Sequence, residues 1–137
     1  MGTRGVGEGP DIRQKIVDSE ETSAQAIEEE IKYFIERGGL SQGELTILSP
    51  RTFGQSSAAI IKDKMLQQLV VLDEYAFRSF PPGKISFSEI PNFKGLENEA
   101  IIVVDLPLPR GSKQAFPHHY VAMSRARAAL SMIFRKQ

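Results

Sequence analysis

Short apolar segments recur along the chain and are separated by segments with a different pattern. The run at residues 101–104 is unbroken, rich in β-branched side chains and too short for a long helix, so it predicts a strand buried on both faces. Residues 84–90 alternate apolar and polar side chains over most of their length, as a strand with one buried face does. The segments expected to form strands are residues 12–17, 45–48, 69–72, 84–90, 101–105 and 130–134.

The segment after the first predicted strand has the spacing of an amphipathic helix. Its apolar residues recur three and four positions apart: Ala24, Ile27, Ile31, Phe34 and Ile35. Asp18 or Ser19 is expected to cap this helix, and Gly38-Gly39 to end it. The acidic run 28–30 lies mostly off the apolar stripe, which predicts that its side chains face solvent.

Two further helices complete the predicted order of elements. One is expected from Ser56 or Ser57 to about Gln68, and one from Pro117 through residue 129, after a proline-containing loop at residues 106–111. Strands that alternate with helices favour right-handed crossovers and a largely parallel sheet with both faces covered. The fold class predicted from this order is therefore α/β.

Composition and charge narrow the class of protein. The 137 residues fit one domain, expected at residues 11–137 after a flexible lead-in of residues 1–10, which holds four glycines and a proline. Lysine plus arginine equals aspartate plus glutamate at 17 each, but the part of the chain after Asp105 carries cations and no acid. The chain has no cysteine and only two histidines, so we expect no disulfide and no metal site. It also has no apolar run of membrane-spanning length, so we expect a cytoplasmic protein without a membrane partner.

Two short motifs carry a resemblance to a known family. Lys94-Gly95-Leu96-Glu97 precedes the buried strand at residues 101–105, and residues 120–127 read Tyr-Val-Ala-Met-Ser-Arg-Ala-Arg. The first resembles motif V of superfamily 1 helicases of the UvrD/Rep type, and the second resembles their motif VI. The two motifs occur in the family's order, each beside a predicted strand.

The resemblance implies the second RecA-like domain (2A) of a helicase motor, a three-layer α/β fold. In that family ATP binds between two RecA-like domains, and the first domain supplies the P-loop and holds Mg²⁺. The present sequence contains no P-loop motif, so we expect this chain alone to bind neither ATP nor Mg²⁺. The resemblance assigns an arginine finger to Arg125 and nucleotide contacts to Gly95, Glu97 and Arg125.

The nucleic-acid side of the resemblance is incomplete. Arg51, with Gln55 and Ser56, partly matches the family's motif IVa, and Arg51 and Lys94 are candidate contacts to single-stranded DNA. Glu89 and Pro91, however, stand where motif V usually has threonine and histidine. An acid repels phosphate and proline donates no backbone hydrogen bond.

Three functions remain open at this stage. The first is the C-terminal motor domain of a UvrD-like DNA helicase or translocase, partnered by an N-terminal P-loop domain. The second is a binding or regulatory module that keeps the helicase fold without ATPase activity. The third is an independent protein that binds a nucleotide or a nucleic acid.

Overall fold

The computed structural model describes residues 11–72, 83–93, 96–107 and 126–136. Within these ranges six strands form one sheet in the order β1-β6-β5-β2-β4-β3, and every pair of neighbours is parallel. The strands are β1 (Asp11–Val17), β2 (Leu45–Ser49), β3 (Leu69–Val71), β4 (Ile85–Glu89), β5 (Asn98–Pro107) and β6 (Ala126–Arg135). The predicted α/β class is confirmed, and the all-parallel sheet is consistent with a RecA-like domain.

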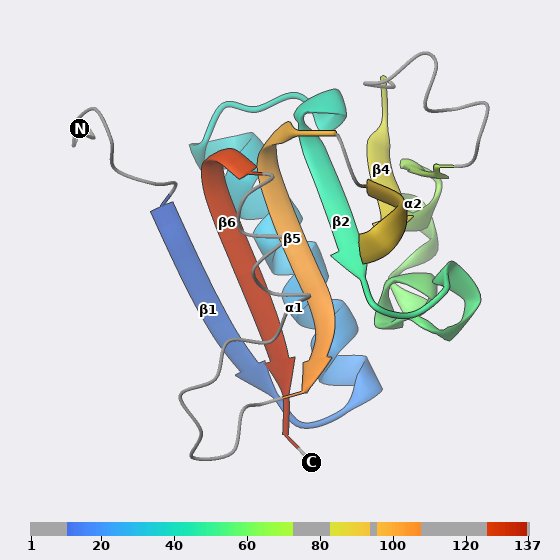
Figure 1. Cartoon of the computed structure of the whole chain (residues 1–137). Coiled ribbons are helices and arrows are strands. Elements are labelled where there is room, and N and C mark those ends of the chain that lie inside the picture. The colour runs from blue at the N-terminus through green and yellow to red at the C-terminus, as the bar shows by residue number, and fades with distance from the viewer. Residues whose placement is uncertain (1–10, 73–82, 94–95, 108–125, 137) are drawn as a thin grey trace.

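Helix α1 (Glu20–Lys32) continues into a π-helical turn at Tyr33–Arg37 and covers one face of the sheet behind β6 and β5 (Figure 1). Ser19 caps it by accepting a hydrogen bond from the backbone N–H of Thr22, as predicted. The helix ends at Gly38-Gly39, and Gly39 has φ +71°, a backbone conformation that glycine adopts without strain. Among the described residues no helix has the length and apolar character needed to cross a bilayer.

The core lies on both faces of the sheet. On the α1 face, Ile27 and Ile31 pack with alternate residues of the central strands, such as Ile47 and Ile102. On the opposite face, Ile90 and Phe93 of the 3₁₀ turn Ile90–Phe93 pack with the intervening residues, such as Ile101. Burial on both faces explains the unbroken apolar run of β5.

The region after β2 differs from its prediction. In place of one helix, residues 53–66 form two 3₁₀ turns, Phe53–Gln55 and Ser57–Ile60, and a four-residue helix α2 (Asp63–Leu66). Ile61 is extended, with φ −69° and ψ 166°, which separates the second turn from α2. The hydroxyls of Ser56 and Ser57 donate to Asp105 on a distant strand, while Oγ of Ser56 also accepts from the N–H of Ala58 and so caps the second 3₁₀ turn and not a long helix.

Strands β5 and β6 begin or end at different residues from those predicted. β5 runs through Leu106 and Pro107, which were expected in a loop. β6 begins at Ala126, so Ala126, Ala128 and Ala129 lie in a strand and not in the helix predicted to start at Pro117. Ala126 pairs with Asn98 and Ala129 with Ala100, and this parallel ladder takes the place of helical hydrogen bonds. The predicted helix at residues 117–125 lies outside the described residues.

Two predictions of exposure were wrong. Ser86 and Ser88 of β4 are buried, so this strand has no solvated face; Ser86 shares a hydrogen bond with Thr46 at 2.8 Å. Glu30 was expected in solvent but is 1% exposed. Its carboxylate accepts hydrogen bonds from Arg13 at 2.7 and 3.1 Å and from Ser131 at 2.8 Å, which meets the cost of its burial.

Candidate functional site

Because all six strands are parallel, their amino ends lie along one side of the sheet and their carboxyl ends along the opposite side (Figure 1). We call these two sides, which run across the strands, the amino edge and the carboxyl edge. Glu97 immediately precedes β5 and lies at the amino edge, whereas Arg51 follows β2 at the carboxyl edge. The structure therefore separates a residue predicted to contact nucleotide from one predicted to contact nucleic acid. Lys94, Gly95 and Arg125 lie outside the described residues.

At the amino edge, Glu97 is paired with Arg127. Nη1 of Arg127 donates to Glu99 at 3.0 Å, and its Nε donates to Glu97 at 3.3 Å. These hydrogen bonds, with Glu99 contributing more than Glu97, raise the pKa of Arg127. All three side chains are partly exposed, Glu97 by 50%, so the carboxylates stay accessible from solvent.

A break in the strand register aims Arg127 at these acids. Asn98 pairs with Ala126 and Ala100 with Ala129, so β6 carries one more residue than β5 over this stretch. Such a bulge turns a side chain out of the regular alternation. Arg127 falls within it, and the guanidinium reaches residues on both sides of Asn98 in consequence.

Asn98 fixes the start of β5. Its Nδ2 donates to the backbone carbonyl of Gly43 at 3.1 Å and to the hydroxyl of Thr46 at 2.9 Å, and its Oδ1 accepts from the N–H of Glu99. The Asn98 side chain is buried, and its bond to Thr46 is made in a region of low dielectric. Glu97 is thereby attached to a rigid point of the sheet.

At the carboxyl edge, Asp105 is the centre of a buried network. Its Oδ2 accepts from the hydroxyls of Ser49 and Ser56, both at 2.6 Å, and its Oδ1 accepts from the N–H and the hydroxyl of Ser57 at 3.1 and 2.8 Å. Ser57 is joined in turn to Ser23 of α1 at 2.8 Å. One carboxylate therefore holds together β2, β5, the 3₁₀ turn after β2 and, through Ser57, helix α1.

A second bulge gives Asp105 this orientation. Val103 pairs with Met132 and Leu106 with Phe134, so here β5 carries the extra residue. Asp105 has φ +61° in this bulge, a left-handed conformation that costs a non-glycine residue energy. The four hydrogen bonds it accepts offset that cost.

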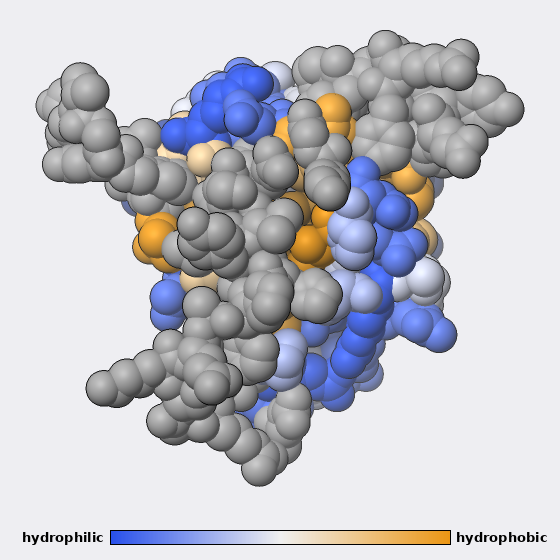
Figure 2. Space-filling view, viewed as in Figure 1, coloured by the Kyte–Doolittle hydropathy of each residue, from blue (hydrophilic) through white to orange (hydrophobic). Residues whose placement is uncertain are grey.

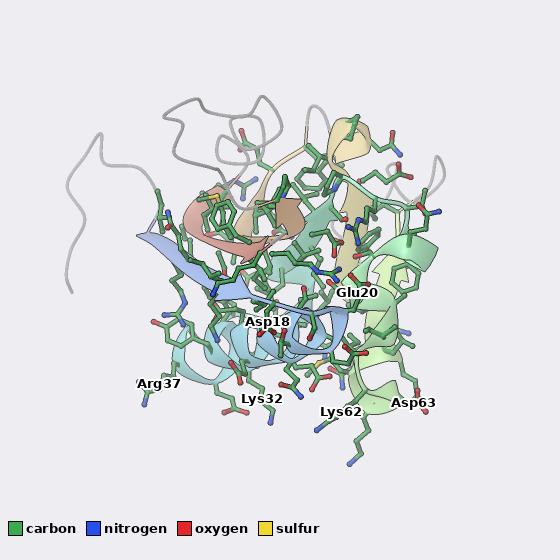
Figure 3. All side chains as sticks on the ribbon, turned by 90° about the horizontal axis from the view of Figure 1, so that it is seen from below. Asp18, Glu20, Lys32, Arg37, Lys62 and Asp63 are labelled. Atoms are coloured by element: carbon green, nitrogen blue, oxygen red, sulfur yellow. The ribbon has the colours of Figure 1, made fainter. Side chains whose placement is uncertain are left out.

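Arg51 lies beside this network and not inside it. Its Nη1 is 3.9 Å from Oδ1 of Asp105 and 3.3 Å from Oε1 of Glu20. Glu20 is the first residue of α1 (Figure 3). The same oxygen of Glu20 accepts from Nη1 of Arg135 at the end of β6. Arg51, Asp105 and Arg135 line a cleft of about 600 Å³ at this edge.

Sequence reasoning assigned no role in the site to several residues that the structure places there. They are Glu20, Asn98, Glu99, Asp105, Arg127 and Arg135. Glu20 reads as a residue that favours the start of a helix, and Arg135 as part of a basic segment. The position of Asp105 at the end of an apolar run was a usable signal, because acids at the carboxyl ends of parallel strands gather at one edge.

No family model and no curated protein matches this chain. Among solved structures, it is similar to the crystal structure of the C-terminal domain of a possible DNA helicase from Lactobacillus plantarum WCFS1. The TM-score is 0.55 and the identity 19%, over 93% of this chain and 74% of that one. At this identity the likeness shows a shared fold.

Proposed function

We propose that this chain is the C-terminal RecA-like domain of an ATP-dependent, UvrD-like DNA helicase or translocase. In this proposal its amino edge meets an N-terminal P-loop domain, and ATP with Mg²⁺ binds between the two. The similarity of fold to the C-terminal domain of a possible DNA helicase supports the proposal. So do the motif V and motif VI resemblances at residues 94–97 and 120–127.

The pairing of β5 with β6 at their amino ends gives the proposal its strongest structural support. Asn98 and Ala126 are directly paired on neighbouring strands. Glu97 precedes the first of them and Arg125 precedes the second. Glu97 and Arg125 come from motifs almost thirty positions apart, yet each is next in sequence to a member of this one residue pair. The pair lies at the edge proposed to meet ATP.

The residues described at this edge fit part of a nucleotide. Glu97 is half-exposed and can accept hydrogen bonds from ribose hydroxyls. Arg127 is already shared by two carboxylates, so it supplies little net positive charge for a triphosphate. We assign that charge to Arg125 as an arginine finger and to the P-loop domain, with Gly95 giving the backbone room to approach the nucleotide.

The test is ATP hydrolysis by a polypeptide that carries this domain together with its P-loop domain. Arg125→Ala should lower single-stranded-DNA-stimulated turnover by about a thousandfold, because the guanidinium stabilises charge on the transferring phosphoryl group. Arg37→Ala removes an exposed arginine at the end of the π-helical turn and serves as the control. Turnover that is equal in the two variants would contradict the arginine-finger assignment.

A second candidate function is a binding or regulatory module without ATPase activity. Glu89 ends β4 at the carboxyl edge, and Pro91 lies in the 3₁₀ turn that follows, where motif V usually offers threonine and histidine to nucleic acid. This candidate predicts a parent polypeptide without a P-loop. It also predicts no DNA-stimulated ATPase activity and no role for Arg51 and Lys94 in binding DNA. A P-loop in the parent together with stimulated ATPase activity would exclude it.

A further inference from the structure

The cleft at the carboxyl edge has the position and lining of an anion site. It lies where β2, β5 and β6 end, and the carboxyl ends of parallel strands are where α/β sheets bind ligands. Arg51 enters it from β2, and Arg135 and Lys136 enter it from the end of β6. Its volume of about 600 Å³ exceeds what a single phosphate group fills.

The carboxylate of Glu20 already occupies the space between the two guanidinium groups. Its Oε1 accepts a hydrogen bond from Nη1 of Arg51 and another from Nη1 of Arg135. The structure therefore contains an oxyanion held by two arginines, which is an arrangement that proteins also use for phosphate. The side chains of Glu20, Arg51 and Arg135 are 35%, 41% and 33% exposed, so water and solutes reach this group.

Asp105, an acid that lines the cleft, lies within ion-pair distance of Arg51 but does not hydrogen-bond to either arginine. Asp105 is buried and its oxygens accept four hydrogen bonds from Ser49, Ser56 and Ser57. Its distance of 3.9 Å from Arg51 is too long for a hydrogen bond. Within the described part of the chain, Glu20 is the carboxylate that hydrogen-bonds to Arg51 and Arg135.

We propose that Arg51 and Arg135 form a phosphate-binding site in which the carboxylate of Glu20 is the built-in competitor. A phosphate group binds by displacing that carboxylate and accepting hydrogen bonds from both guanidiniums. Lys136 adds a further positive charge at the rim of the cleft. Glu20 thus lowers the affinity of the site and makes it selective for ligands with more than one phosphate or with additional contacts. The proposal goes beyond the motor function, because it concerns the opposite edge of the sheet and needs no ATP hydrolysis.

The test compares Glu20→Gln with Glu21→Gln in the 137-residue chain. Both remove one negative charge from the first turn of α1, but Glu21 is exposed and makes no hydrogen bond to Arg51 or Arg135 in the structure. Two probes are used at about 50 mM salt, a fluorescent single-stranded oligonucleotide of about 15 nucleotides and inorganic pyrophosphate. Thermal unfolding of each variant shows whether the fold is kept.

Glu20→Gln should tighten binding of at least one probe by roughly two- to fivefold, the range that one exposed charge pair carries. Glu21→Gln should leave that affinity unchanged, and adding Arg135→Ala to Glu20→Gln should reverse the gain. A gain for the oligonucleotide identifies backbone phosphate as the ligand, and a gain for pyrophosphate alone identifies free phosphate. Equal effects of the two glutamine variants, or no binding of either probe to Glu20→Gln, would overturn the site. Neither result bears on the ATPase test of Arg125.

Discussion

Asp105 and Arg127 lie in the two bulges of the β5–β6 ladder, one near each end of the strand pair. The bulge near the amino edge gives β6 an extra residue and turns Arg127 toward Glu97 and Glu99. The bulge near the carboxyl edge gives β5 the extra residue and turns Asp105 toward three serines. The ladder between them is regular, so it holds both groups at a fixed separation.

The Asp105 network is expected to be a large contributor to stability. Asp105→Ala leaves the N–H of Ser57 and three hydroxyls without their acceptor in a buried region, which should lower the free energy of unfolding by about 3–5 kcal/mol. Asp105→Gly loses the same bonds but relieves the left-handed φ of +61°, so it should be less destabilising than the alanine variant by about 1 kcal/mol. Urea denaturation of both variants measures the difference. A glycine variant less stable than the alanine variant would show that the bulge is not strained.

Glu30 makes stability depend on acid pH. Burial alone would raise the pKa of Glu30, but hydrogen bonds from Arg13 and Ser131 outweigh it and the pKa lies below the usual 4.5. A carboxyl group whose pKa is lower in the folded state stabilises the protein fully above the unfolded value, and this contribution is lost as the pH falls through the folded value. Glu30→Gln should therefore cost about 2 kcal/mol at neutral pH and progressively less below pH 4.5.

The exposed neighbour Glu29, which pairs with Lys15 at 2.5 Å, provides the control for that experiment. Glu29→Gln removes the same charge from the same helix, but the pair is solvated and should change stability by less than about 1 kcal/mol. Denaturation curves of both variants and the unmodified chain, taken at several pH values from neutral to acidic, give the comparison. A gap between Glu30→Gln and the unmodified chain that stays constant over this range would refute the linkage.

Asn98 is expected to support the amino edge. Asn98→Ala removes the hydrogen bonds to the half-buried carbonyl of Gly43 and to the hydroxyl of Thr46, which keeps only its bond to Ser86; this should cost about 1–3 kcal/mol. Because the start of β5 is then less firmly held, the amides of residues 98 and 99 should exchange hydrogen faster than those of residues 101–103. Hydrogen exchange resolved by residue measures both. Uniform acceleration along β5 would mean that Asn98 acts on global stability alone.

Arg127 is expected to affect nucleotide binding more than folding, which follows from the proposed function. Its ion pairs with Glu97 and Glu99 are solvated, so Arg127→Ala should leave the thermal unfolding midpoint almost unchanged. The two carboxylates then lose their shared cation and repel a triphosphate, so KM for ATP should rise in a polypeptide that includes the P-loop domain, while kcat changes less. Arg127→Lys should restore part of the affinity. An unchanged KM would remove Arg127 from the nucleotide edge.

The sequence predicted the regular parts of this fold well because periodicity is a local property. The strands and α1 followed from apolar spacing, and the buried run of β5 from its composition. The bulges were not predictable in this way, because one extra residue changes which face a side chain takes without changing the apolar run around it. The same holds for Glu30, whose burial depends on Arg13 and Ser131, residues far from it along the chain.

The candidate site was predictable in part. The position of Glu97 before β5 and of Arg51 after β2 follows from local sequence, and the parallel order then assigns them to opposite edges. The partners could not be assigned, because Arg127–Glu97 and Arg135–Glu20 join segments whose pairing is decided by the register of β6.

Among the strands of this sheet, β1 is synthesised first but gains its ladder partner last. Its ladder partner is β6, from Asp11 opposite Ala129 to Val17 opposite Arg135, so on the ribosome it must wait until nearly the whole domain has emerged. Contacts between residues so far apart in sequence slow folding. Until β6 is made, β1 is unpaired and exposes the apolar side chains of Ile12 and Ile16. Figure 2 shows that some apolar surface remains on the β1 side of the folded domain. A nascent chain stalled before residue 126 should therefore bind chaperones, and release should coincide with synthesis of the last strand.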